Sequence, residues 1–178
     1  MSELSELEAC VLGLVWSEAP CTPYRVQQIF KDSPSPHWSG SAGSIYPIFE
    51  RLTRRGFVRS EARSRGRRAS RVFRTTDQGR KELRRWIGPP LPAWTVDIPI
   101  DPLRTRLRFL GALPAGKRLA LLREAKDLLD QKLIEIRNDC RRLKELDDPF
   151  PHAMARGAAY LMKARIQWLN EVERTISG

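Results

Sequence analysis

The sequence predicts a mainly α-helical protein with one small β-hairpin, divided into two domains. In the first half, amphipathic helical segments precede two short apolar stretches that flank an arginine-rich turn. In the second half, apolar residues recur at steps of three and four over a much longer distance. Between the halves, residues 88–101 hold four prolines and lack helical periodicity, and their apolar side chains predict packing along the protein surface. We therefore expect a first domain at 1–87, a linker at 88–101 and an all-α domain at 102–178.

Three helical segments are expected in the first domain. Residues 4–17 carry apolar side chains at helical spacing. A second helix begins after Thr22, a favourable N-cap, with Pro23 in its first turn. A loop at residues 32–41 separates it from a third helix, which ends at Gly56. The apolar face of this third helix consists of Ile45, Ile48, Phe49 and Leu52.

A β-hairpin follows the third helix. Residues 57–58 open a strand, residues 59–71 form a polar and arginine-rich turn region, and residues 72–74 return as the second strand. A further helix begins at Thr76 or Asp77, since both are good capping residues. Three helices followed by a two-stranded hairpin is the order of a winged helix-turn-helix domain. In that architecture the third helix enters the major groove of DNA, and the hairpin, or wing, lies along the backbone or reaches the minor groove.

The positive charge of the chain is concentrated in one segment. Residues 51–85 contain fourteen basic residues, thirteen of them arginine, against three acidic ones, so this segment carries the whole formal net charge of +11. The rest of the chain balances at 18 basic and 18 acidic residues. A solvated surface would use lysine as freely, whereas the arginine guanidinium forks onto phosphate oxygens and guanine edges. The segment therefore favours nucleic acid as the partner over an acidic protein or a membrane surface.

Four motifs of the first domain follow the pattern of one family. They are LSELEACVLGLV, TPYRVQQIF, SAGSIYPIFERLTRRGFV and VFRTTDQGRKEL. With them, residues 4–87 resemble the winged-helix domain of the PadR-type transcriptional regulators, whose recognition helix carries a Gly-Thr-Ile-Tyr-Pro element. Two positions depart from the family pattern: Val72 and Phe73 stand where two tyrosines are frequent, and Ala42 stands where a proline is common. The resemblance implies a DNA-binding winged-helix domain.

The expected DNA contacts lie on the third helix and on the wing. Ser44 and Tyr46 stand at the N-terminal end of the helix, where hydroxyls and free backbone N–H groups meet phosphates or base edges. An alternative places Tyr46 in the core and leaves the wing arginines merely solvated. The predicted DNA-binding residues are Ser44, Tyr46, Pro47, Arg51, Arg54, Arg55, Arg63, Arg65, Arg67, Arg68 and Arg71.

The second domain is expected to be all-α and to form a dimer. A short helix follows Pro102, and a helix of around thirty residues, roughly 45–50 Å long, extends from Ala115 to about Leu146. Its heptad-like seam needs a partner helix, which residues 152–176 provide. Both helices keep surplus apolar surface, which a two-fold dimer would bury. The predicted dimerisation residues are Leu122, Leu129, Leu133, Ile136, Leu143, Leu161 and Leu169.

A two-fold dimer presents two winged helices to two half-sites, so we expect a pseudo-palindromic operator. In relatives, a carboxy-terminal helical domain, also found in activators of virulence genes, forms the dimer and holds a small aromatic or lipophilic effector. The resemblance therefore implies a repressor that such a molecule releases from DNA. The predicted effector-binding residues are Trp16, Arg25, Trp94, Arg108, Tyr160 and Trp168.

Several classes of function lack the residues that they need. Cys10, Cys21 and Cys140 are odd in number, far apart and accompanied by only two histidines, so neither a disulfide framework nor a metal site is expected. No catalytic motif or phosphate-binding loop appears, so we expect neither an enzyme nor a cofactor. The acidic start and the lack of an apolar stretch of about 18 residues predict a cytoplasmic protein without a membrane partner. An RNA-binding winged helix and a module that docks an acidic protein remain as alternatives.

Overall fold

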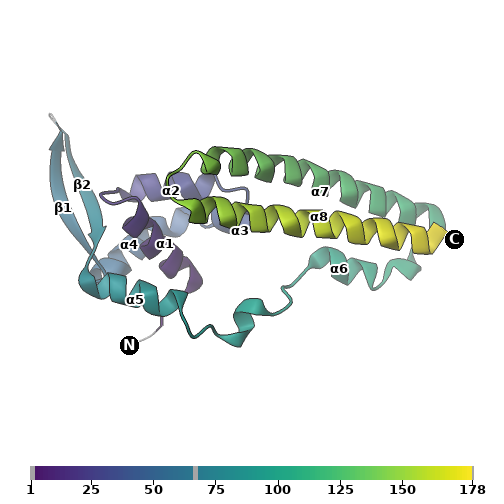
Figure 1. The fold of residues 1–178 in the computed structure, drawn as a ribbon, viewed down its shortest axis with the longest axis horizontal. Helices are drawn as coiled ribbons and strands as arrows, with labels where there is room; N and C mark the ends of the chain where they lie inside the picture. Colours follow the sequence, from purple (N-terminus) through teal and green to yellow (C-terminus); the bar gives the residue numbers. More distant parts are fainter. Residues whose placement is uncertain (1–2, 66–67, 178) are drawn as a thin grey trace. The chain divides into compact units, whose positions relative to one another are not determined.

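The computed structural model describes residues 3–65 and 68–177. Contacts divide the chain into two compact units, Met1–Asp97 and Ile98–Gly178, and the division falls within the segment predicted as a linker. Each unit has a hydrophobic core of its own. The described residues form helices and one two-stranded antiparallel hairpin, which is the predicted fold class (Figure 1).

The first two helices begin at capping residues that the sequence supplies. Helix α1 (Glu6–Ser17) starts with a capping box: the Ser5 hydroxyl accepts a hydrogen bond from Glu8 N at 3.3 Å, and the Glu8 carboxylate accepts one from Ser5 N at 3.1 Å. Helix α2 (Pro23–Lys31) begins after Thr22, whose hydroxyl accepts from Arg25 N at 3.2 Å. The predicted cap at Thr22 is therefore confirmed.

The segment between the second and third predicted helices is not a plain loop. It contains the short helix α3 (Pro36–Gly40) and the 3-10 turn η1 (Ala42–Ser44), so the expectation of a loop was wrong there. Trp38 stacks on the buried Phe30 of α2 with ring centroids 4.8 Å apart, a contact between two helices that stabilises α3. Helix α4 (Ile45–Arg54) follows η1 directly, and the Ser44 side chain makes no capping hydrogen bond within the described chain.

A glycine ends α4 and leads into the hairpin. Gly56 has a φ of +71°, a left-handed conformation that favours glycine after a helix. Strand β1 (Val58–Arg65) then pairs with strand β2 (Arg68–Thr75) from Val58↔Thr75 to Arg65↔Arg68. Most of the predicted turn region is therefore strand, because backbone pairing does not require apolar side chains. The far part of the hairpin projects beyond the helices of this unit (Figure 1).

Helix α5 (Asp77–Ile87) is tied to the start of the hairpin. The Thr76 hydroxyl accepts from Gly79 N at 3.0 Å and donates to Gly56 O at 2.6 Å. A Cβ on Gly79 would lie 2.0 Å from the Phe57 carbonyl oxygen, so only glycine allows this close approach. The helices and the base of the hairpin share one buried core, which includes Val11, Leu12, Val15, Val26, Phe30, Ile45, Ile48, Phe49, Leu52 and Phe57.

The segment after α5 does not bury its apolar side chains within the chain. It contains only the short 3-10 turn η2 (Ala93–Val96) among its described elements. Within their own units these side chains lack the packing partners that the sequence led us to expect, and their packing along the protein surface stays a prediction. The exposed fractions are 63% for Leu91, 63% for Trp94, 81% for Val96, 76% for Ile98 and 95% for Ile100.

The second unit is a helical hairpin with a short helix beside it. Helix α7 (Ala115–Lys144) and helix α8 (Pro149–Ser177) lie side by side (Figure 1). Helix α6 (Pro102–Leu107) and the turn η3 (Leu110–Ala112) precede them. Asp101 caps α6 and accepts a hydrogen bond from Arg165 Nη2 at 2.8 Å, which joins α6 to α8. The core of this unit contains Leu103, Leu107, Leu122, Leu129, Met162, Ile166, Leu169 and Val172.

Candidate nucleic-acid interface

Helix α4 has one fully buried face and one open face. Its apolar residues Ile45, Ile48, Phe49 and Leu52 are at most 2% exposed and lie in the core. The opposite face carries exposed side chains, as the 3.6-residue helical period requires. They are Tyr46, Pro47, Glu50, Thr53 and Arg54. Tyr46 is 49% exposed, so the alternative that placed it in the core is wrong.

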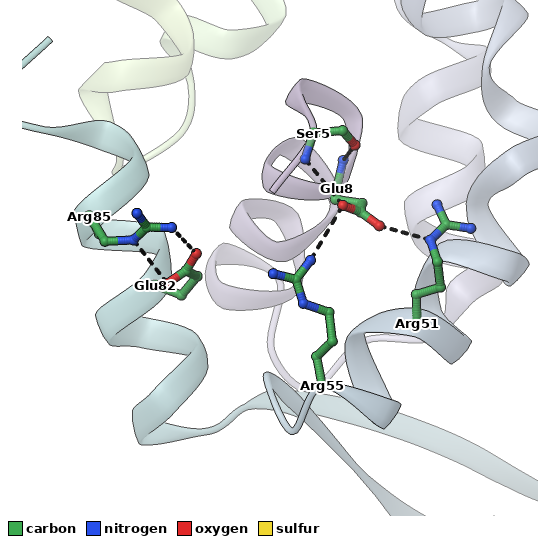
Figure 2. A network of polar contacts seen from close by, with 6 residues as sticks. All are labelled: Ser5, Glu8, Arg51, Arg55, Glu82 and Arg85. Atoms are coloured by element: carbon green, nitrogen blue, oxygen red, sulfur yellow. Dashed lines mark hydrogen bonds and ion pairs between the residues drawn. The ribbon is translucent and has the colours of Figure 1, made fainter. Parts of the chain in front are cut away.

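Two arginines of α4 turn inward to a carboxylate on α1 (Figure 2). Glu8 is only 8% exposed. Its Oε1 accepts a hydrogen bond from Arg51 Nε at 2.8 Å, and its Oε2 lies 3.6 Å from Arg55 Nη1. The Arg55 guanidinium also lies over the Phe57 ring, 4.7 Å from its centroid. We call this cluster of Glu8, Arg51 and Arg55 the α1–α4 clamp.

The clamp keeps Glu8 ionised. Burial alone would raise the pKa of Glu8, but hydrogen bonds from Arg51 and from Ser5 N, together with the charges of both arginines, hold it below its ordinary value of 4.5. At neutral pH the carboxylate therefore offsets part of the charge on Arg51 and Arg55. Sequence reasoning missed Glu8. The available signal was an acid on the apolar face of the first helix, because a buried carboxylate needs a cationic partner.

A second ion pair lies on α5 (Figure 2). Arg85 donates to Glu82 from Nη2 at 2.6 Å and from Nε at 3.1 Å. These hydrogen bonds outweigh burial and hold the pKa of the Glu82 carboxyl below its ordinary value. Arg85 therefore has a carboxylate partner within its own helix.

The hairpin contributes further arginines, one pair of which is partly neutralised. Glu61 lies 3.3 Å from Arg59 and 3.5 Å from Arg74. Arg71 is exposed on β2. Of the other predicted wing contacts, Arg63 and Arg65 lie on β1 and Arg68 lies on β2, while Arg67 is outside the described residues.

The predicted dimerisation residues lie mostly inside one chain. Five of them, Leu122, Leu129, Leu133, Ile136 and Leu169, are at most 7% exposed within the α7–α8 pair. Leu143 is half-buried and Leu161 is 64% exposed. The seam that the sequence revealed therefore holds α7 and α8 together. Other large apolar side chains are left exposed: Leu128 and Ile134 on α7, Leu146 between the two helices, and Phe150, Met154, Tyr160 and Ile176 on α8.

The predicted effector residues are spread over both units. Trp16, Arg25 and Trp94 belong to the first unit, where Arg25 pairs with Glu18 at 2.9 Å. Arg108, Tyr160 and Trp168 belong to the second unit, where Trp168 packs against the core. Arg156 donates to the Tyr160 hydroxyl at 2.6 Å. A surface concavity beside the hairpin contains none of the predicted residues; its lining is Pro20, Glu61, Ala62, Val72 and Arg74.

The structure gives no evidence for a reactive thiol at Cys10 or Cys21 or, among the residues described, for a metal site. Burial raises the pKa of the Cys10 and Cys21 thiols to about 11, so both stay protonated at neutral pH. Among residues 3–65 and 68–177, no three acidic, histidine or cysteine side chains are grouped to hold a metal ion. Over the same ranges, no helix combines the length and the apolar character needed to cross a bilayer.

Solved structures with a similar fold include transcriptional regulators. Bacillus subtilis PadR in complex with operator DNA is 22% identical, with a TM-score of 0.79, over 97% of this chain and 99% of that one. The same protein in complex with p-coumaric acid is 21% identical, with a TM-score of 0.78, over 97% and 96% of the two chains. A PadR-like regulator from Bacillus cereus is 16% identical, with a TM-score of 0.71, over 98% of each chain.

Two family models divide the chain between them. Residues 101–177 match the model described as virulence activator alpha C-term, and residues 11–85 match the transcriptional regulator PadR-like family. Among curated proteins no sequence matches the chain. The PadR-like model covers helix α4 and the hairpin, and the virulence activator model covers helices α6 to α8. The chain therefore joins a region that matches the PadR-like family of transcriptional regulators, at residues 11–85, to one that matches the virulence activator model, at residues 101–177.

Proposed function

We propose that the protein is a repressor that binds a pseudo-palindromic operator as a homodimer and is released by a small aromatic effector. Helix α4 lies in the major groove of each half-site, and the hairpin lies against the DNA backbone. The observation that carries the proposal is the open face of α4, where Tyr46, Pro47 and Arg54 are exposed beside the arginine-rich hairpin. Operator DNA and p-coumaric acid are the molecules with which Bacillus subtilis PadR was crystallised, and they support the choice of ligand classes.

A salt titration tests the contact with DNA. Duplexes selected from a random pool would be measured by mobility shift, first with the wild-type chain. If six to eight phosphates are neutralised per dimer, log K falls with log[salt] with a slope on the order of −5 to −7. A slope near zero contradicts the proposal. Competition with duplex RNA of the same length distinguishes the proposed DNA-binding function from an RNA-binding function, because the RNA would displace the DNA from an RNA-binding protein.

Tyr46→Ala tests the placement of α4. It removes an aromatic side chain that is 49% exposed, so it leaves the core intact while it weakens operator binding by about tenfold or more. Phe109→Ala is the matched control, because this aromatic side chain is 67% exposed and lies in the second unit, outside every predicted site. Equal operator affinity of the two variants would show that α4 does not contact the DNA.

The proposed dimer uses apolar surface that a single chain leaves open. Phe150, Met154 and Leu161 follow one another on α8 at intervals of four and seven residues, and they are 78%, 63% and 64% exposed. This stripe fits a second copy of the same helix related by a two-fold axis. Leu161→Glu places a charge in it and would shift the chain to a monomer in sedimentation equilibrium. Gln167→Glu adds a charge at another exposed position of α8 and leaves the dimer unchanged.

The proposed effector is an aromatic acid. An aromatic ring stacks on tryptophan, and a carboxylate pairs with arginine, which are the two residue types that dominate the predicted set. A panel of aromatic acids that includes p-coumaric acid would be screened for release of the selected operator, with tryptophan emission as a second readout. We expect at least one member to release DNA and to change the emission. If none does so at millimolar concentration, an aromatic acid is not the effector.

A further inference from the structure

One acid on the open face of α4 differs from every other acid beside it. Glu61, Asp77 and Glu82, the three acids of the arginine-rich segment, each pair with an arginine of their own element or of the neighbouring strand. Glu8 on α1 pairs with Arg51 and Arg55 in the α1–α4 clamp. Glu50 lies on α4 itself and is exposed. Within the described ranges no basic side chain lies within the 4.0 Å ion-pair distance of its carboxylate.

The clamp accounts for the isolation of Glu50. Arg51 follows Glu50 directly in the sequence, and Arg55 lies five residues after it. Both turn toward Glu8 on α1 (Figure 2). Arg54 is one helical turn further along, in the order that favours an ion pair with a preceding glutamate. The two side chains nevertheless remain unpaired among the contacts of the described chain. Glu50 is thus an exposed carboxylate on α4 that has no ion pair among the contacts of the described chain.

The position of Glu50 is central on the open face. Residues advance by about 100° around a helix, so Glu50 and Arg54 lie nearly opposite to Ile48 and Leu52, which are buried. When such a helix lies in the major groove, the residues opposite to the core face the base edges, and those on the flanks face the two phosphate strands. Glu50 and Arg54 therefore occupy the positions that face bases.

Chemistry narrows what a carboxylate does at that position. Phosphates repel it, so it weakens binding to DNA in general. Its favourable partner in the major groove is the N4 amino group of cytosine, which has an acceptor on one side only, O6 of the paired guanine, whereas the adenine amino group lies between two acceptors, its own N7 and thymine O4. We propose that Glu50 is a specificity-determining residue that accepts a hydrogen bond from cytosine N4. Arg54, about 6 Å further along the helix axis, then reads a guanine about two base pairs away.

This inference rests on the proposed DNA-binding function, and base selection tests the two separately. Duplexes would be selected from a random pool by the full-length wild-type chain, by Glu50→Gln and by Glu50→Ala. The wild type is expected to prefer cytosine at one position of each half-site by about fivefold or more. Glu50→Ala would lose that preference and bind unrelated duplexes more tightly. Glu50→Gln would shift it toward adenine, with which glutamine pairs in the major groove.

Controls assign each outcome. Glu6→Gln removes one negative charge from an exposed position of α1, and it should keep the wild-type base preference at every position. Arg54→Ala should lose the guanine while it keeps the cytosine. If Glu50→Ala selects the same cytosine with the same ratio as the wild type, Glu50 does not read a base and the inference fails. If the wild type itself selects no duplex, the proposed function fails instead.

Discussion

The inner edge and the outer face of α4 use the same residue type in opposite ways. On the inner edge, Arg51 donates through Nε to the buried carboxylate of Glu8, and Arg55 lies beside the same group and over the Phe57 ring. On the outer face, Arg54 is exposed next to Glu50 and Tyr46. The three arginines fall within five residues of one helix, yet the structure assigns two of them to the contact between α1 and α4.

The two sides of α4 show that the amount of positive charge in a segment differs from the amount that is available to contact DNA. The net charge of the segment 51–85 identifies the surface that attracts phosphate. It does not identify the side chains that meet the DNA, because Glu8 comes from a distant helix and holds part of that charge. Arg51 keeps its Nη end unpaired among the contacts of the described chain, so it can meet a phosphate only in the orientation that Glu8 allows. The clamp thus fixes how α4 is rotated on its support.

Removing the carboxylate of the clamp should have the largest effect on stability. Glu8→Ala deletes one side of the capping box and leaves two arginines without their shared partner, so we expect a loss of about 2–3 kcal/mol in the free energy of unfolding. Urea unfolding followed by circular dichroism measures it. Glu50→Ala, at an exposed position without an ion pair in the described chain, should stay within about 0.5 kcal/mol of the wild type. Equal losses in the free energy of unfolding of Glu8→Ala and Glu50→Ala would contradict the conclusion that the clamp stabilises the fold more than the exposed carboxylate of Glu50 does.

Replacing Arg54 or Arg51 with alanine should affect operator binding and the stability of the fold differently. Arg54→Ala is expected to weaken operator binding by about 1–3 kcal/mol and to leave unfolding unchanged, because its side chain is exposed and, in the proposed complex, faces the DNA. Arg51→Ala should lower the free energy of unfolding by about 1 kcal/mol, since it removes a charged hydrogen bond to a buried group. Mobility shift and urea unfolding on both variants measure the two quantities. A stronger binding defect in Arg51→Ala than in Arg54→Ala would contradict this division and would mean that Arg51 contributes more to the DNA contact than Arg54.

The sequence was sufficient for most of the first unit, because local signals decide it. Thr22 and Pro23 at a helix start, and Gly56 at a helix end, act through their own backbone preferences. The strands were predicted too short, since the pairing of Arg65 with Arg68 depends on a ladder and not on apolar side chains. Helix α3 was missed because Trp38 is held by a stacking contact with Phe30 on another helix.

The site was predictable only in part, for a physical reason. Helical periodicity places Tyr46 and Arg54 on the open face of α4, and the structure agrees. Periodicity alone could not show that Arg51 also pairs with Glu8, because this ion pair spans 43 residues of sequence. In the second unit the apolar seam was found, but its pattern does not tell an intrachain partner from a second copy. Leu129 and Leu169 are buried within one chain.

The smallest of the expected effects is a pH dependence that separates the clamp from an ordinary surface acid. The pKa of Glu8 in the folded chain lies below its ordinary value of 4.5, so its carboxylate stabilises the fold above that pH, and the stabilisation is lost as the pH falls through the folded value. Glu8→Gln should therefore be less stable than the wild type at pH 7, with a difference that shrinks below about pH 4.5. Glu6→Gln removes the same charge from an exposed position of the same helix and should show no such convergence.

Urea unfolding of the three proteins at pH 7, 5, 4 and 3 measures the differences, and subtraction cancels the titration of all other groups. A constant gap between Glu8→Gln and the wild type over this range would mean that packing, and not the charge of Glu8, holds α1 against α4.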